Sequence, residues 1–116
     1  MTEPIAVADV QANIAALIAA HPVVLFMKGT PARPQCRFSA ATVAVLQRHD
    51  VSIHAVDVLA DPAIRAGIKT YSDWPTVPQL YINGEFVGGC DIVTDMHRSG
   101  DLFRLVRHWS ATEIST

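Results

Sequence analysis

The 116-residue chain has few of the features that mark secreted, membrane or nucleic-acid-binding proteins. Its two cysteines, Cys36 and Cys90, are too few for a secreted disulfide scaffold and too far apart for a local metal knuckle. The nine basic residues are scattered and the net charge is −2, so no block of like charge predicts a nucleic-acid arm or a membrane-surface patch. Glu3 and Asp9 are the only charges near the start, which argues against a secretory signal. We expect a cytoplasmic protein with no nucleic-acid or membrane partner.

Formal charge is also missing from residues 10–27, so a membrane helix has to be weighed. His21 and Pro22 split this stretch, and Gln11 and Asn13 are polar. A helix followed by a buried strand explains the stretch better than a membrane span does.

Half of the residues are hydrophobic, which is enough for one domain over residues 1–116 with its own core. Apolar spacing predicts helices over residues 6–20, 36–48 and 61–71, strands over 23–27 and 52–58, a hairpin around Asn83-Gly84, and a helical tail from Asp91 to about Trp109 that breaks near Gly100. Asp61 and Pro62 supply a helix N-cap and first helical residue. This order predicts a parallel βαβ unit, an antiparallel hairpin and a closing helix, hence an α/β sandwich around a small mixed sheet.

Cys36 lies in the stretch "MKGTPARPQCRFSAATVAVL", between a Pro/Gly-rich loop and the first turn of a predicted helix. Unpaired backbone N–H groups and the helix dipole favour a thiolate at this place, and Lys28, Arg33 and Arg37 add positive charge nearby. The plainer alternative is a cysteine buried for packing. The flanking polar residues and prolines favour a reactive, partly exposed thiolate.

Three segments together resemble the monothiol glutaredoxins of the thioredoxin-fold superfamily: "MKGTPARPQCRFS", "DPAIRAGIKTYSDWP" and "WPTVPQLYINGEFVGGCD". The resemblance runs from about Val23 to Leu105. The family's Lys-Gly-Thr/Ser-Pro, Cys-Gly-Phe-Ser, Trp-Pro-Thr-x-Pro and Gly-Gly-Cys-Asp motifs occur in order, with Arg37 in place of one glycine. The resemblance implies a single glutaredoxin domain and a thioredoxin-like three-layer α/β/α sandwich with a four-stranded mixed sheet.

The resemblance also implies glutathione binding and a 2Fe-2S cluster, held in a homodimer by Cys36 of each subunit and the thiols of two glutathiones. Such a protein is an iron–sulfur carrier that acts in cluster transfer and assembly and in cell redox homeostasis. Its implied partners are iron–sulfur acceptor proteins and BolA-like proteins, and its implied enzymatic activity is at most weak. Ser39 stands where dithiol relatives have a resolving cysteine. The alternative function is a glutathione-dependent thiol-disulfide oxidoreductase that deglutathionylates through Cys36 without a stable cluster.

Carried onto this sequence, the resemblance implies that Lys28 and Arg65 face the glycyl carboxylate of glutathione, with Lys69 as a third cation. For Arg65 and Lys69 the alternative is a solvated helix face, because they are four residues apart. For Lys28, at the end of a strand beside the thiolate loop, the binding role is favoured.

The resemblance further implies that the backbone of Val77, before a cis-proline, pairs with the cysteinyl backbone of glutathione. An ordinary trans Pro78 remains the alternative. Cys90 and Asp91 begin the next helix, whose free N–H groups and the Asp91 carboxylate suit the γ-glutamyl carboxylate and ammonium. Cys90 is interpreted as a packing residue beside glutathione, the alternative being a disulfide with Cys36.

Arg37 departs from the family pattern. Its side chain can hold Cys36 as a thiolate, pair with a carboxylate of glutathione or of a partner, or crowd the second subunit. Phe38 is interpreted as packing near the ligand, and Trp74 as loop packing or dimer-edge surface. The five histidines have no metal-ligand spacing and are expected to be surface or hydrogen-bonded residues.

Overall fold

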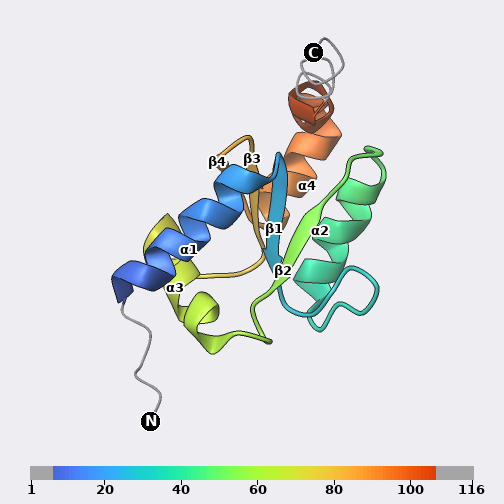
Figure 1. The fold of residues 1–116 in the computed structure, drawn as a ribbon. Helices are drawn as coiled ribbons and strands as arrows, with labels where there is room; N and C mark the ends of the chain where they lie inside the picture. Colours follow the sequence, from blue (N-terminus) through green and yellow to red (C-terminus); the bar gives the residue numbers. More distant parts are fainter. Residues whose placement is uncertain (1–6, 107–116) are drawn as a thin grey trace.

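A computed structural model describes residues 7–106, which form a sheet with helices on both faces (Figure 1). The elements in chain order are α1 (Val7–Ala20), β1 (Val23–Met27), α2 (Arg37–Gln47), β2 (His54–Asp57), α3 (Pro62–Ser72), β3 (Gln79–Ile82), β4 (Glu85–Gly88) and α4 (Cys90–Ser99). This is the predicted order of elements. Within the described range, none of the helices has both the length and the apolarity needed to cross a bilayer.

The sheet has four strands in the order β2-β1-β3-β4. β1 pairs with β2 in parallel and with β3 antiparallel, and β3 pairs antiparallel with β4. The mixed four-stranded sheet and the βαβ unit followed by a hairpin are therefore confirmed.

The fully buried strand β1 lies at the centre of two apolar layers. Val23, Leu25 and Met27 belong to the cluster that also contains the buried residues of α2 and α4. Val24 and Phe26 alternate with them and pack with the buried residues of α1 and α3. Figure 1 shows α1 and α3 on one side of the sheet and α2 and α4 on the other. Because both faces of β1 are covered, its sequence is continuously apolar instead of alternating.

Local signals place the ends of several elements correctly. Asp61 Oδ1 accepts hydrogen bonds from the N–H groups of Ala63 and Ile64, at 3.1 and 3.3 Å, and thereby caps α3. Asn83 and Gly84 both have positive φ, at 51° and 85°, as a tight hairpin turn requires.

Most predicted helix boundaries lie within one residue of those in the structure, and two predicted segments differ by more. The strand expected over residues 52–58 is shorter in the structure, where His54–Asp57 pairs with Val24–Met27 of β1. The helical tail breaks at Gly100, whose φ of 89° ends α4, and residues 101–106 are helical again. The predicted end near Trp109 lies outside the described residues.

Candidate functional site

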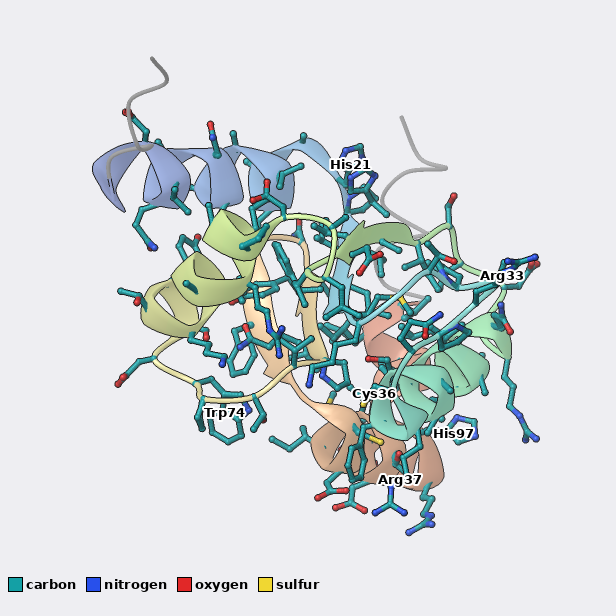
Figure 2. The ribbon with its side chains drawn as sticks, turned by 90° about the horizontal axis from the view of Figure 1, so that it is seen from below. His21, Arg33, Cys36, Arg37, Trp74 and His97 are labelled. Carbon is teal, nitrogen blue, oxygen red and sulfur yellow. The ribbon has the colours of Figure 1, made fainter. Side chains whose placement is uncertain are left out.

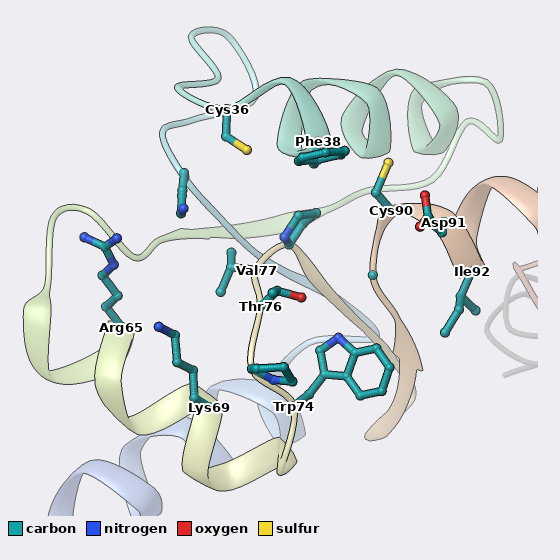
Figure 3. A pocket seen from close by; sticks show the side chains of 14 residues that line it. Cys36, Phe38, Arg65, Lys69, Trp74, Thr76, Val77, Cys90, Asp91 and Ile92 are labelled. Carbon is teal, nitrogen blue, oxygen red and sulfur yellow. The ribbon is translucent and has the colours of Figure 1, made fainter.

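A cavity of about 610 Å³ lies where β1 ends and where α2 and α4 begin (Figure 3). All seven residues that the sequence singles out as a site line this one cavity: Lys28, Cys36, Arg65, Lys69, Val77, Cys90 and Asp91. The other lining residues come from the first turns of α2 and α4 and from the two loops that face them: Phe38, Trp74, Pro75, Thr76, Pro78, Gly89 and Ile92. Trp74, which was expected to be a loop-packing or dimer-edge residue, thus also forms part of the cavity wall.

Cys36 is the N-cap residue of α2, with an extended backbone and a half-buried thiol. The backbone N–H of Ser39 lowers the pKa of this thiol most, burial opposes it with the second-largest effect, and the N–H of Phe38 and the charge of Lys28 add smaller lowering effects, so that the pKa is lowered on balance. The thiolate is therefore favoured at a helix N-terminus, as predicted. The Arg37 guanidinium does not contribute to this shift and lies over the Phe38 ring, 4.9 Å from the ring centroid.

The loop between β1 and Cys36 is held at its first two residues. The N–H of Lys28 donates to the buried Ser39 Oγ at 3.1 Å, and the N–H of Gly29 donates to Asp57 Oδ1 at 2.9 Å. Gly29 has a φ of 88°, and a Cβ there would lie 2.5 Å from the carbonyl oxygen of Arg33. Ser39 is thus a hydrogen-bond acceptor that ties the strand end to α2, a role that sequence reasoning missed.

Three cations gather on one side of the cavity. Arg65 and Lys69 extend from α3, on the wall opposite α2 (Figure 3), and Lys28 follows β1. The two ion pairs within residues 7–106 join residues of the C-terminal helical part, Asp95 with Arg98 and Asp101 with Arg104. The cations of the cavity therefore have no carboxylate partner in the described part of the chain, and the site suits an anionic ligand.

The loop from Trp74 to Pro78 contributes backbone to the cavity. The Val77–Pro78 peptide bond is cis, and the backbone N–H and C=O of Val77 have no hydrogen-bond partner in the described part of the chain. The buried Gln79 supports this loop, because its Nε2 donates to the carbonyl oxygens of Trp74 and Thr76 at 3.3 and 3.1 Å. Sequence reasoning missed Gln79, since a glutamine at the start of a strand carries no signal that it is buried.

The turn into α4 closes the remaining side. Gly88 has a φ of 151°, and a Cβ there would lie 2.7 Å from the side chain of Ile92. A Cβ at Gly89 would lie 3.2 Å from the carbonyl oxygen of Pro78, so the turn passes close to the cis-proline loop. Cys90 and Asp91 begin α4 here, and Cys90 is a half-buried free thiol. In Figure 3 the Phe38 ring lies between the side chains of Cys36 and Cys90.

The described histidines form two pairs away from the cavity. His49 Nε2 and His97 Nδ1 are 2.9 Å apart, and the rings of His21 and His54 stack with their centroids 3.7 Å apart. Within residues 7–106 there is no group of three or more His, Cys, Asp or Glu side chains that could hold a metal ion. His108 lies outside the described residues.

Comparison with known proteins gives the family. The sequence model of the family described as Glutaredoxin matches residues 23–87. Over 93 residues the chain is 55% identical to Glutaredoxin-related protein 5, mitochondrial, of Danio rerio, an alignment that covers 79% of this chain but only 60% of the relative. Over 106 residues it is 49% identical to Monothiol glutaredoxin-5, mitochondrial, of Saccharomyces cerevisiae, covering 89% of this chain and 71% of the relative.

A solved structure agrees with these sequence matches. The solution structure of a monomeric truncated mutant of Trypanosoma brucei 1-C-Grx1 superposes with a TM-score of 0.78 at 41% sequence identity, and the match covers 93% of this chain and 94% of that one. Likeness of this extent in both sequence and structure means that the chain belongs to the glutaredoxin family, among its monothiol members, and has their thioredoxin-like α/β fold.

Proposed function

We propose that the cavity binds glutathione with the glutathione thiol beside Cys36. The observation that carries this proposal is the pairing, in one cavity of about 610 Å³, of a thiol whose pKa is lowered with a wall of cations that lack a carboxylate partner within residues 7–106. Glutathione is a tripeptide with two carboxylates, one ammonium and a thiol, so it needs cations, an anion and open backbone groups at matching places.

The lining residues supply each of these groups. Arg65 and Lys69, with Lys28, face the glycyl carboxylate in the proposed complex. The free N–H and C=O of Val77 pair with the cysteinyl backbone in the manner of an added strand. The first N–H groups of α4 take the γ-glutamyl carboxylate, and the Asp91 carboxylate takes the ammonium. Cys90 packs beside the γ-glutamyl end.

We further propose that Cys36 serves as one thiolate ligand of a 2Fe-2S cluster that the protein carries as cargo. Such a cluster takes four ligands and prefers thiolates. Within residues 7–106, Cys36 and Cys90 are the only thiols, and no group of three potential ligands exists. The missing ligands must come from outside the subunit. Two glutathione thiols and Cys36 of a second subunit supply them, which makes the holo form a cluster-bridged homodimer. Iron–sulfur acceptor proteins and BolA-like proteins are the proposed partners.

A second candidate function is deglutathionylation, and Arg37 is the observation that favours it. This side chain replaces the family glycine next to the thiol and is exposed at the edge that a second subunit would approach. In this reaction the Cys36 thiolate attacks the glutathione sulfur of a mixed disulfide, and the partner's thiolate leaves and takes up a proton. A free glutathione thiolate then attacks the resulting Cys36–glutathione disulfide, which yields oxidised glutathione and regenerates the Cys36 thiolate.

Anaerobic reconstitution with iron, sulfide and glutathione tests the cargo proposal. Visible absorption and gel filtration would be followed for the unaltered protein, Cys36→Ser and Arg37→Gly. The proposal predicts a brown dimer that requires glutathione and is lost in Cys36→Ser. A colourless monomer that becomes a brown dimer only as Arg37→Gly would refute the cluster proposal for this chain and leave the oxidoreductase function.

A cytoplasmic location also stays a proposal. The two relatives described above carry the word mitochondrial in their names. Fractionation of cells that produce the full-length protein, followed by immunoblotting, tests it, and enrichment in an organelle would contradict it.

A further inference from the structure

Arg37 is an exposed cation next to the reactive thiol in the chain, and it contacts an aromatic ring. Its guanidinium carbon lies 4.9 Å from the centroid of the Phe38 ring, well within the distance at which a cation is attracted to an aromatic face. Phe38 is 46% exposed and lines the cavity, whereas Arg37 is not one of the residues that line it. The contact with the ring therefore favours a position of the guanidinium at the rim, on the α2 side of the opening. Figure 2 shows Arg37 on the outside of the molecule, close to Cys36.

The charge of Arg37 has no carboxylate partner within the described part of the protein. It is absent from the two ion pairs there, and it does not shift the Cys36 pKa. Arg37 belongs to α2, whereas two of the cations proposed for the glycyl carboxylate, Arg65 and Lys69, extend from α3 on the opposite wall of the cavity (Figure 3). A guanidinium whose N–H donors are free and which the Phe38 ring draws to the rim can pair with a carboxylate of a molecule that approaches Cys36 from outside.

We propose that Arg37 is a specificity-determining residue that selects glutathionylated protein segments with a carboxylate next to the modified cysteine. In such a segment glutathione fills the cavity and brings the partner's cysteine to Cys36, so the residues that flank that cysteine meet the rim where Arg37 stands. This inference rests on the proposed glutathione site and on the deglutathionylation chemistry given above.

The test uses two glutathionylated peptides that differ only in the residues on either side of the cysteine, Glu in one and Gln in the other. Release of the peptide thiol is followed by chromatography under single-turnover conditions. For each protein we take the ratio of the rate constant for the Glu peptide to that for the Gln peptide. The two peptide thiolates differ as leaving groups, and this difference cancels when the ratio of a variant is compared with that of the unaltered protein. Since an exposed charge pair contributes little, we expect Arg37→Gln to lower this ratio by about two- to five-fold.

Three controls separate the proposed pairing from other effects. Arg48→Gln removes the same charge at the exposed C-terminal end of the same helix and should leave the ratio unchanged. Arg37→Lys keeps the charge without the planar fork and should retain part of the preference. In 0.5 M salt the ratios of the unaltered protein and Arg37→Gln should converge. Alkylation by iodoacetamide should keep its pH profile in Arg37→Gln.

Several results would overturn the inference. An unchanged ratio in Arg37→Gln, or an equal fall in Arg48→Gln, would show that Arg37 does not read the flanking residues. Weaker binding of free glutathione to Arg37→Gln in calorimetry would assign Arg37 to glutathione itself. If neither peptide reacts with the unaltered protein, the deglutathionylation chemistry is refuted and this inference with it; reaction with equal ratios throughout refutes the inference alone.

Discussion

Replacing Gln79 with methionine removes three hydrogen bonds from the support of the cavity loop with little change in side-chain volume. The amide of Gln79 is fully buried; it donates to Trp74 and Thr76 at 3.3 and 3.1 Å and accepts from the Tyr81 hydroxyl at 3.2 Å. The 3.1 Å bond lies at the long end of the usual range and the other two lie slightly beyond it, so each bond contributes at the low end of about 0.5–1.5 kcal/mol. We expect Gln79→Met to lower the free energy of unfolding by about 1.5 kcal/mol.

A double-mutant cycle with Tyr81→Phe checks the origin of that loss. Tyr81 is buried, and its burial raises the pKa of its hydroxyl to about 12. In Gln79→Met the Tyr81 hydroxyl loses the acceptor Gln79 Oε1, and the Ser72 side chain is its one remaining side-chain partner in the described part of the chain. Because Tyr81→Phe removes the orphaned group, the double variant should be more stable than the sum of the single effects by about 0.5–1 kcal/mol. Urea unfolding measures all four proteins.

Two results would refute this reasoning. Gln79→Met within 0.5 kcal/mol of the unaltered protein would mean that the bonds to the loop contribute nothing net. Strict additivity with Tyr81→Phe would mean that the two side chains do not interact. If the loop is held as described, Gln79→Met also weakens glutathione binding several-fold in calorimetry, while Tyr81→Phe changes it less.

Three further predictions concern single groups. The pH midpoint for alkylation of Cys36 by iodoacetamide should lie below the ordinary thiol value of 9.0, because backbone N–H groups favour the thiolate, and a midpoint at or above 9.0 would contradict this. Gly29→Ala should lower the free energy of unfolding by about 1–3 kcal/mol in urea titrations, since its Cβ would meet the Arg33 carbonyl; an unchanged midpoint would refute it. Burial lowers the pKa of His49 and His54 in the folded protein, so the unfolded chain takes up protons first as the pH falls. The protein should therefore be most stable above the unfolded pKa near 6.5 and lose stability as the pH falls from there through the lower folded pKa of each histidine. Thermal unfolding from pH 7.5 to 5.5 measures this fall, and a stability that rises on acidification would show the sign to be wrong.

Much of the fold was predictable because its signals are local. The apolar run of β1, the Asp61 cap and the Asn83-Gly84 turn each act over a few residues, and the structure has all three where they were expected. The end of β2 was not predictable in the same way. It depends on pairing with β1, a segment distant in the sequence, and that pairing is a property of the sheet.

In the candidate site, too, the residues that belong to local motifs were predictable, and those that depend on distant contacts were not. The motif resemblance predicted seven site residues, and all seven line one cavity. Several of them lie together because the end of β1, the start of β3 and the end of β4 meet at the same end of the sheet. The supports of the cavity were missed because they depend on contacts between distant segments: the Ser39 hydroxyl bonds to the end of β1, and Asp57 bonds to Gly29. The orientation of Arg37 was also beyond the sequence, which left several roles open for this side chain; in the structure its guanidinium lies over the Phe38 ring.

The central claim is that glutathione binds in the cavity that Cys36 shares with Arg65 and Lys69. The most direct test is a titration of the isotopically labelled protein with reduced glutathione, followed by amide chemical shifts in two-dimensional NMR spectra. The account predicts saturable shifts at Val77, at the first turns of α2 and α4 and around Arg65, with weaker binding in Arg65→Gln and unchanged binding in Arg48→Gln. Shifts centred elsewhere, or no saturable shift at millimolar glutathione, would contradict it.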